Sequence, residues 1–304
     1  MPAPIIISPI IDQLLQRPDC ALALSISGGK DSQALVEAVS HEYGRRGWQA
    51  TVFAIHADLG RAEWAQLLPM CQKIADSHGL DLIVVQRTKG DLVSRFEQRI
   101  EATAGTSTPF WPSASMRYCT SEMKAGPINK HLRQYNLVIS AEGIRAQEST
   151  ARAKKRPLTV RKNITTKRLK TLSPEEALAQ WAETENGRLA LTWFPILDYS
   201  LDDVWHAIGT TQAELDDRHA LYRQGKDEQR FDLMHQALDR WPAHPAYVFG
   251  NTRVSCVFCV LANKNDLKVG AEQNPELLDL YLDLEVVGDA TFKHKQSLAD
   301  IITS

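Results

Sequence analysis

The amino-acid sequence predicts an α/β protein with a doubly wound, mostly parallel sheet and a helical C-terminal extension. In the first 145 residues, short apolar runs alternate with longer runs whose apolar residues recur at helical spacing. The apolar runs are almost unbroken, as is typical of parallel strands whose two faces are both covered by helices. Beyond residue 200 the helical pattern dominates.

The apolar runs predict four strands, at 21–27, 51–57, 82–86 and 136–143. Helices are predicted at 32–46, at 61–77, from about Thr120, over Ser200–Gly209 and near Pro275–Val287. The helix at Ser200 begins with a Ser-x-x-Asp capping signal. We therefore expect an α/β domain over 1–200 and a helical region over 201–304.

Composition excludes several classes of protein. The chain has 304 residues, of which 43% are hydrophobic and 24% charged, so it is neither disordered nor fibrous. A net charge of −2 gives no overall attraction to nucleic acid or membrane. The N-terminal apolar stretch is interrupted by prolines and lacks signal-peptide features. Five cysteines without export signals argue against disulfides and favour a cytoplasmic location.

One segment departs from this balance. Residues 145–171 hold ten basic residues and one acid, a net charge of +9, which leaves −11 on the rest of the chain. The segment has little apolar periodicity and is predicted to be a mobile basic loop rather than a packed element. It is either a clamp for a polyanion such as nucleic acid or a solvated run of charge. The candidate nucleic-acid contacts are Arg152, Lys154, Lys155 and Arg156.

The strongest local signal is SGGKDS at residues 27–32, where a predicted strand turns into a predicted helix. Gly28 and Gly29 let the backbone approach a phosphate closely, and free N–H groups at a helix start favour an anion. Ser27 and Ser32 add hydroxyl donors, and Lys30 adds a positive charge. The pattern is neither a Walker A loop nor a G-x-G-x-x-G turn. The structural alternative is a turn that merely needs glycine.

SGGKDS resembles the PP-loop of the ATP pyrophosphatases, whose pattern SGGxDS it matches at every fixed position. Members of that family cleave ATP between the α and β phosphates. The resemblance therefore implies ATP and Mg²⁺ as cofactors, with Lys30, Asp31 and Arg145 as the catalytic residues.

Four further elements narrow the resemblance to the branch that contains phosphoadenosine phosphosulfate reductase-like proteins. They are HADLGRAEW at 56–64, RYCTSEMKAGPI at 117–128, GIRAQESTAR at 143–152 and FPILDYSLDDVW at 194–205. They are similar to the family's H-x-D-x-G-x-x-E, R-x-C-T-x-x-x-K-x-x-P, G-I-R-x-x-E-S-x-x-R and P-I-x-x-x-x-x-x-D-V-W elements. Because loops at the carboxyl ends of parallel strands converge, we expect one shared crevice.

These elements supply further candidates for nucleotide binding. Asp58 is a ligand for Mg²⁺ or a ribose hydroxyl, or a surface-turn aspartate. Arg145 holds pyrophosphate or the substrate's phosphate, or is one more member of the basic loop. His56 is expected to be positional rather than catalytic. Gly143, which opens the GIRAQESTAR element, completes the nucleotide-binding set.

Three cysteines are candidates for metal or sulfur chemistry. Cys256 and Cys259 form a C-x-x-C pair, and Cys119 is the natural third thiolate. The resemblance implies a [4Fe–4S] cluster, although the sulfur-activating enzymes of DNA phosphorothioation have a further cysteine that VLANKNDLK (260–268) lacks. A three-cysteine cluster with one open iron, a persulfide relay between two thiols, and structural zinc or plain packing are the alternatives.

The resemblance implies an enzyme that adenylates a nucleic-acid oxygen with ATP and lets sulfur displace AMP. DNA backbone phosphorothioation is the best match and tRNA thiolation the second. A phosphoadenosine phosphosulfate reductase-type oxidoreductase is a further alternative, but the chain ends HKQSLADIITS without that group's reactive cysteine. A non-catalytic nucleic-acid-binding module would leave SGGKDS unexplained. The implied partners are DNA in preference to tRNA, a cysteine desulfurase, other modification-system proteins and a second copy in a homodimer, with no membrane.

Overall fold

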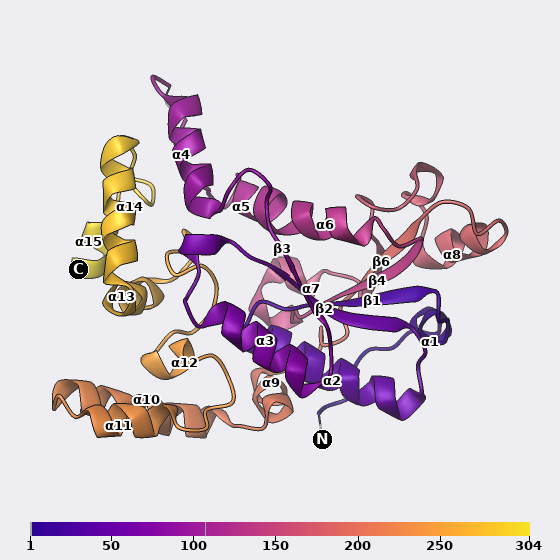
Figure 1. Cartoon of the computed structure of the whole chain (residues 1–304), viewed down its shortest axis with the longest axis horizontal. Coiled ribbons are helices and arrows are strands. Elements are labelled where there is room, and N and C mark those ends of the chain that lie inside the picture. The colour runs from indigo at the N-terminus through magenta and orange to yellow at the C-terminus, as the bar shows by residue number, and fades with distance from the viewer. Residues whose placement is uncertain (1, 107) are drawn as a thin grey trace. The chain divides into compact units, whose positions relative to one another are not determined.

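A computed structural model describes residues 2–106 and 108–304 (Figure 1). It contains a six-stranded sheet, flanked by helices, with the strand order β3-β2-β1-β4-β6-β5. The strands are β1 (Cys20–Ser25), β2 (Thr51–Ala57), β3 (Leu82–Val85), β4 (Leu137–Glu142), β5 (Leu158–Val160) and β6 (Leu189–Trp193). β1 pairs in parallel with β2 and β4, and β4 with β6, whereas β5 is antiparallel to β6. The predicted fold class is confirmed.

The helices alternate with the strands and then follow them. They are α1 (Pro9–Leu15), α2 (Lys30–Arg46), α3 (Leu67–Ser77), α4 (Leu92–Thr103), α5 (Tyr118–Thr120), α6 (Gly126–Leu132), α7 (Thr150–Ala153), α8 (Pro174–Ala182), α9 (Leu201–Ile208), α10 (Gln212–Asp227), α11 (Phe231–Leu238), α12 (Ala246–Phe249), α13 (Lys264–Gln273), α14 (Pro275–Val287) and α15 (Leu298–Thr303). Short 3₁₀ turns are η1 (Gly60–Ala62), η3 (Ala146–Glu148) and η4 (Lys167–Leu169), and η2 (Ser121–Ala125) is a π-helical turn. No helix of the described residues is long and apolar enough to cross a membrane.

The chain forms two compact units that alternate along the sequence. The first unit contains Met1–His56, Pro69–Val84 and Ile128–Leu215, and the second contains Ala57–Leu68, Val85–Pro127 and Asp216–Ser304. The expected domain boundary after residue 200 stays a prediction.

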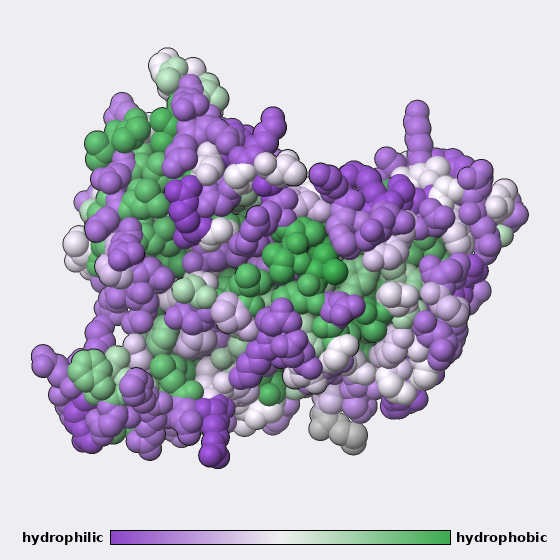
Figure 2. Space-filling model, in the orientation of Figure 1, coloured by the Kyte–Doolittle hydropathy of each residue, from purple (hydrophilic) through white to green (hydrophobic). Residues whose placement is uncertain are grey.

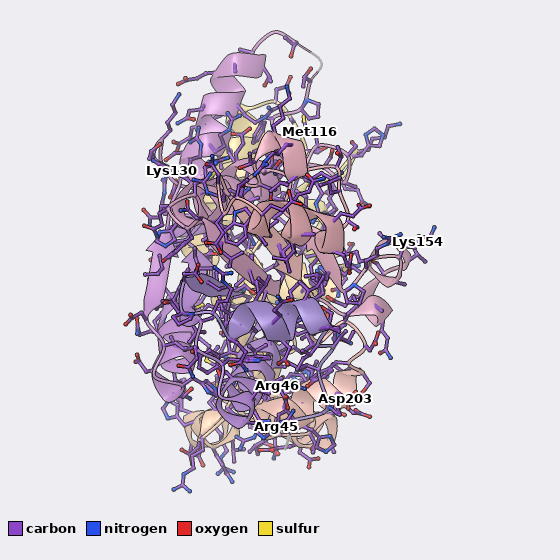
Figure 3. All side chains as sticks on the ribbon, turned by 90° about the vertical axis from the view of Figure 1, so that its right-hand side faces the viewer. Arg45, Arg46, Met116, Lys130, Lys154 and Asp203 are labelled. Atoms are coloured by element: carbon purple, nitrogen blue, oxygen red, sulfur yellow. The ribbon has the colours of Figure 1, made fainter. Side chains whose placement is uncertain are left out.

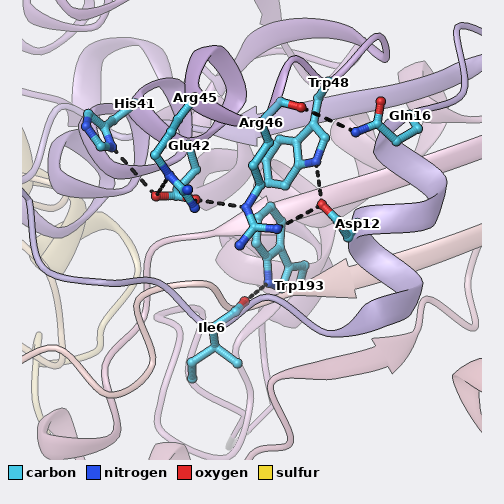
Figure 4. Close-up of polar contacts among 9 residues, drawn as sticks. All are labelled: Ile6, Asp12, Gln16, His41, Glu42, Arg45, Arg46, Trp48 and Trp193. Atoms are coloured by element: carbon cyan, nitrogen blue, oxygen red, sulfur yellow. Dashed lines mark hydrogen bonds and ion pairs between the residues drawn. The ribbon is translucent and has the colours of Figure 1, made fainter.

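The C-terminal end of α2 is fixed by a polar network in the first unit (Figure 4). Arg46 pairs with Asp12 at 3.1 Å and with Glu42 at 2.9 Å, and the indole of Trp48 donates to Asp12 at 2.8 Å. The hydrogen bond from Arg45 is the largest cause that holds the pKa of Glu42 at about 2. These bonds anchor the helix whose other end begins at Lys30.

The second unit has an aromatic core. Trp111 stacks on Tyr281 with ring centroids 5.5 Å apart, and Phe96 meets Tyr281 edge-on at 5.8 Å. A pocket of about 270 Å³ separates α4 from α14, and apolar residues gather there in Figure 2. Its lining consists of Glu97, Ile100, Glu101, Leu280, Asp283, Leu284 and Val287.

The prediction that residues 145–171 form a loop without packed elements is wrong. β5 lies within this segment and pairs with β6 through Leu158 and Val160. Arg161 extends the pairing, since its backbone N–H donates to Ala190 O at 2.8 Å. Its guanidinium donates to Asn129 at 2.8 Å and to Glu142 at 2.7 Å. The basic segment therefore contains an edge strand. One of its cations, Arg161, is paired with Glu142 of β4.

Outside this segment, one helix boundary differs from the prediction and one strand is missing from it. The helix expected at 61–77 begins only at Leu67, because Gly60–Ala62 form a 3₁₀ turn. β6 is not among the predicted strands, since its five residues run directly into Phe194–Leu197, a stretch interrupted by Pro195. β2 has the predicted bounds, and β1, β3 and β4 lie within one or two residues of theirs.

Candidate nucleotide site

The turn between β1 and α2 holds its shape through its own serines. Gly28 has a φ of +67°, a left-handed conformation that favours glycine. The Ser32 hydroxyl donates to Gly29 O at 2.8 Å and accepts from the Ser27 N–H at 3.1 Å. Gly29 is the N-cap of α2, and no side chain in this described turn caps the helix. A helix start without a side-chain cap, next to a glycine turn, is a geometry suited to an anion.

Three charged side chains gather at this turn. Arg145 Nε lies 2.5 Å from one carboxylate oxygen of Asp31, and Lys30 Nζ lies 3.6 Å from the other. Lys30 and Arg145 are each only 7% exposed. One carboxylate therefore faces two nearly buried cations, which leaves a local excess of positive charge. The structure brings together the three residues that the sequence predicts as catalytic.

Gly143 positions this cluster through close packing. A Cβ atom at Gly143 would lie 2.5 Å from Asp31 O and 3.1 Å from Ser32 Cα. The end of β4 therefore rests directly on the first turn of α2, and only glycine allows that approach. Arg145 follows two residues later, and its backbone N–H donates to Glu148 at 2.8 Å.

His56 supports the turn from the end of β2. Its Nδ1 lies 3.1 Å from Ile26 O, and the ring is buried. A carbonyl oxygen only accepts hydrogen bonds, so Nδ1 must carry the proton. The Sγ atom of Cys71 lies 3.7 Å from the same nitrogen. This geometry fits the positional role that we expect for His56, because Ile26 directly precedes the turn.

Trp205 and the α9 element also contribute to the first unit's site. Lys30 Nζ lies 5.9 Å from the centroid of the Trp205 ring, and α9 packs against α2. Ser200 caps α9 and exchanges hydrogen bonds with Asp203. The sequence resemblance includes this element, but no role was predicted for Trp205. The D-V-W end of the FPILDYSLDDVW element was the sequence signal that could have pointed to Trp205.

Asp58 belongs to the second unit, where its carboxylate is engaged by protein donors. Oδ1 accepts from the Gly60 N–H at 2.7 Å, and Oδ2 accepts from the side chain of Gln86. Its backbone N–H donates to Val85 O at 3.0 Å. These bonds fix the turn after β2. The assignment of Asp58 to Mg²⁺ or a ribose hydroxyl stays a prediction.

The three candidate cysteines lie within electrostatic range of one another in the second unit. Burial raises the pKa of Cys119, and the Cys259 thiol raises it further. Burial likewise raises the pKa of Cys256 to about 12, against the lowering effect of Lys124. Lys124 lies on the π-helical turn that follows Cys119, and the sequence did not single it out. Cys119, Cys256 and Cys259 are free thiols and partly exposed.

The placement of these thiols does not make a metal-binding set. Among residues 2–106 and 108–304, no group of three or more His, Cys, Asp or Glu side chains is arranged to hold a metal ion. A tetrahedral site or a [4Fe–4S] cluster wants four ligands, and the chain offers three thiols here. The residues therefore do not fit the cluster as they are placed. The cluster stays a prediction from the resemblance.

The four candidate nucleic-acid contacts differ in their surroundings. Arg152 of α7 pairs with Glu148 at the end of η3, so its charge is partly neutralised within the protein. Lys155 Nζ lies 5.1 Å from the centroid of the Phe194 ring. Lys154, Lys155 and Arg156 are exposed, and Lys154 points away from the protein in Figure 3. These three consecutive cations are exposed, as are Lys162, Lys167 and Arg168 later in the segment.

A nucleotide-using α/β protein is the class that the doubly wound sheet and the glycine turn define. Residues 21–276 match the phosphoadenosine phosphosulfate reductase domain, and the chain belongs to this family.

Two known proteins show weaker similarity. An uncharacterized 37.8 kDa protein in the gpa 5′ region of Escherichia phage 186 is 25% identical over 282 residues, which cover 80% of this chain and 68% of that protein. This chain is also similar to Candida glabrata FMN adenylyltransferase, whose crystal structure was determined with FAD and inorganic pyrophosphate. The two sequences are 15% identical, and the two structures superpose with a TM-score of 0.32. The match covers 64% of this chain and 49% of that one. A likeness this low says nothing about activity.

Proposed function

We propose that the chain is an ATP pyrophosphatase that adenylates a nucleic-acid oxygen for sulfur incorporation, with DNA backbone phosphorothioation as the reaction. The observation that carries this proposal is the intact SGGKDS turn with Lys30, Asp31 and Arg145 gathered around it. Membership of the phosphoadenosine phosphosulfate reductase family supports a nucleotide substrate.

In the first step, a phosphodiester oxygen of the nucleic acid attacks the α-phosphorus of ATP. The bond between that phosphorus and the bridging oxygen to the β-phosphorus breaks, and pyrophosphate leaves with the electron pair. The N–H groups at the start of α2 and the ammonium of Lys30 stabilise the charge that develops on pyrophosphate. Arg145 holds a phosphate oxygen, and Asp31 keeps both cations in place. Mg²⁺, when bound through the ATP phosphates, shares the charge of the leaving group.

In the second step, sulfur replaces AMP. A cysteine thiolate of the second unit attacks the terminal sulfur of a donor persulfide, and the donor thiolate leaves. The resulting persulfide attacks the adenylated phosphorus, and AMP departs with its oxygen. A second cysteine thiolate then attacks the protein-bound sulfur, which releases the phosphorothioate and leaves a cysteine–cysteine disulfide. A dithiol reductant restores the two thiols. The cysteine desulfurase implied by the sequence resemblance would supply the donor persulfide.

The exposed cations of the basic segment are proposed to hold the nucleic acid. Lys154, Lys155 and Arg156 follow the Arg145 element closely in the sequence and have solvent-exposed side chains. Phosphate contacts by such residues make binding strongly salt-dependent. Thiolation of tRNA would use the same charges and is the second candidate acceptor chemistry.

A sulfonucleotide reductase activity is the other candidate function, because the family match names that reductase domain. It would consume phosphoadenosine phosphosulfate and release sulfite, with two electrons from a dithiol. The intact SGGKDS turn favours ATP instead.

The deciding experiment is product analysis of the anaerobically prepared full chain with Mg²⁺ and α-labelled ATP, with DNA, with tRNA and with neither. We expect AMP and pyrophosphate, with DNA giving the larger stimulation. Asp31→Ala should abolish the products, whereas Asp202→Ala, an exposed acid in the first turn of α9, should retain them. Release of ADP, or of sulfite from phosphoadenosine phosphosulfate instead, would overturn the proposal.

Nucleic-acid binding is tested in the same preparation. Replacing Lys154, Lys155 and Arg156 together by Ala should weaken DNA binding and reduce the salt slope by up to about 0.9 for each phosphate that is no longer neutralised. A charge-matched control replaces Lys73, Lys130 and Arg223, which are exposed on other elements. Equal binding by both triple variants would show that the basic segment is merely solvated.

A further inference from the structure

The hydroxyl group of Tyr281 is buried without a hydrogen-bond partner. Tyr281 lies on α14, is 0% exposed, and its Oη has no donor or acceptor among the described residues. Burial of an unpaired hydroxyl destabilises the folded protein, because the group loses its hydrogen bonds to water. A phenylalanine would fill the same space without this cost, so packing alone does not account for a tyrosine here.

The ring of Tyr281 is fixed by aromatic neighbours. It stacks on Trp111, meets Phe96 edge-on, and contacts Phe258 and Phe292 with centroids 5.1 and 6.3 Å away. Such packing leaves the hydroxyl little freedom of direction. Tyr118 in the same unit offers a contrast, because its hydroxyl donates to Phe110 O at 2.6 Å.

Two cysteine thiols are the chemically relevant neighbours. Phe258, which contacts the Tyr281 ring, stands between Cys256 and Cys259 in the sequence. Burial is the largest cause that raises the pKa of Tyr281, and both of these thiols raise it further, followed by Tyr118 and Asp91. The phenol is therefore protonated at neutral pH and available as a hydrogen-bond donor, and its ring contacts Phe258 of the segment that carries both thiols.

We propose that Tyr281 is a positioning residue whose hydroxyl donates a hydrogen bond to the persulfide sulfur carried on Cys256 or Cys259. This inference rests on the proposed function, because it requires sulfur to pass through these thiols. A neutral thiol is a weak acceptor, whereas a persulfide anion is charged and forms the stronger, charge-assisted bond. The hydroxyl thus gains its partner when sulfur is loaded, and it holds the terminal sulfur in one direction for attack on phosphorus.

The test uses the full chain, prepared without oxygen and loaded with inorganic tetrasulfide. A cysteine thiolate attacks a sulfane sulfur of tetrasulfide, one S–S bond breaks, and trisulfide leaves with the electron pair. Persulfide on Cys256 and Cys259 is measured by alkylation and peptide mass, and its loss is followed over time after the tetrasulfide is removed and a monothiol is added.

We expect Tyr281→Phe to load to the same extent but to lose its persulfide about tenfold faster than the wild type. Its melting temperature should equal or exceed that of the wild type, because an unpaired buried hydroxyl is removed. The matched control is Tyr43→Phe in the first unit, which loses a 2.6 Å hydrogen bond to Ala50 O. That control should melt lower and keep the wild-type persulfide lifetime.

Two other outcomes would overturn the inference. Only the second would also overturn the sulfur step of the proposed function. Equal persulfide lifetimes in the wild type and Tyr281→Phe would remove the role of Tyr281 and leave the sulfur relay standing. Absence of persulfide from Cys256 and Cys259 in the wild type would remove both the role of Tyr281 and the sulfur step of the proposed function. Product analysis with ATP would then show whether the adenylation step survives.

Discussion

Asp31 connects the two cations of the nucleotide site. Its carboxylate faces Arg145 on one side and Lys30 on the other, and both cations are almost fully buried. A charge removed from water is costly unless a group of opposite charge lies beside it. Asp31 therefore stabilises the buried charges of Lys30 and Arg145 before any phosphate binds. An incoming phosphate would compete with the Asp31 carboxylate for Lys30 and Arg145. These two cations are already in place, so binding would not have to order mobile side chains.

Gly143 provides a direct test of how this cluster is positioned. Gly143→Ala would place a Cβ atom 2.5 Å from Asp31 O, and backbone must move to relieve that contact. We expect a loss of about 1–3 kcal/mol in the free energy of unfolding, as for overpacked sites, and weaker ATP binding. Urea unfolding and equilibrium ATP titration measure the two effects.

Gly44→Ala is the matched control for that substitution. Gly44 lies within α2, and a Cβ atom there would meet nothing within 4 Å. Alanine at an open helical position should stabilise the protein by about 0.5–1 kcal/mol. If Gly143→Ala were as well tolerated as this control, the close approach of β4 to α2 would not position the site.

At the scale of single residues, the sequence predicts what local pattern encodes. The order of Ser27, Gly28, Gly29 and Lys30 between a strand and a helix is visible in the sequence, and the structure places these residues in one turn. Gly143 was predicted to bind nucleotide, yet its first requirement is steric and comes from a helix more than a hundred residues earlier. Such a contact exists only after folding, so no local pattern could show it.

The edge strand β5 shows how charge can be part of a structural element. Arg161 follows β5 directly, and its guanidinium bonds to Asn129, Glu142 and Thr192 at 2.7–3.2 Å. Its side chain is only 12% exposed. The guanidinium of Arg161 therefore stabilises the edge of the sheet, whereas the cations at 154–156 are exposed to solvent.

We expect Arg161→Met to reduce the free energy of unfolding by about 1.5–3 kcal/mol, because charge-assisted hydrogen bonds are removed and Glu142 keeps an unpaired carboxylate. The salt slope of DNA binding should stay near the wild-type value. Urea unfolding and DNA titration at several salt concentrations measure both properties.

Lys162→Met is the neighbouring control, since Lys162 is exposed and should tolerate the change within about 0.5 kcal/mol. A stable Arg161→Met protein with a reduced salt slope would assign Arg161 to nucleic-acid binding rather than to the sheet.

At the scale of elements, composition alone misjudged this segment. Ten cations in 27 residues dominate the pattern, and the three-residue strand inside it has too little periodicity to stand out. Long, almost wholly apolar strands such as β2 and β4 are predictable, because burial on both faces fixes their composition. Short edge strands depend on a partner elsewhere in the chain.

At the scale of the whole chain, the division into two alternating units was not foreseeable from composition. The second unit takes Ala57–Leu68 and Val85–Pro127 from the half of the sequence that otherwise builds the sheet. Its aromatic core joins Phe96 and Trp111 to Tyr281, residues that lie up to 185 positions apart. Contacts at such separations follow from the tertiary fold rather than from local periodicity.

Acid stability of the whole chain should depend on His244 in the second unit. His244 is 0% exposed, its Nδ1 accepts from the Ala246 N–H at 3.1 Å, and its ring meets Trp64 edge-on. Burial lowers the pKa of His244 to about 4, against about 6.5 in the unfolded chain. As pH falls, the unfolded chain binds this proton first. The stabilising contribution is therefore complete above pH 6.5 and is lost as pH falls from 6.5 toward 4.

The size of this loss is bounded by the difference between the two pKa values, which corresponds to about 3 kcal/mol. Urea unfolding at intervals between pH 7.5 and 4.5 should show the decline in the wild type. His244→Asn retains an acceptor for the Ala246 N–H, and we expect it to be less stable at pH 7.5 but to decline less steeply below pH 6.5. Burial also lowers the pKa of His131. His131→Asn is therefore measured in parallel, to separate the contribution of His131 to the pH dependence from that of His244. Identical slopes in the wild type and His244→Asn would show that the buried imidazole is not what makes the second unit sensitive to acid.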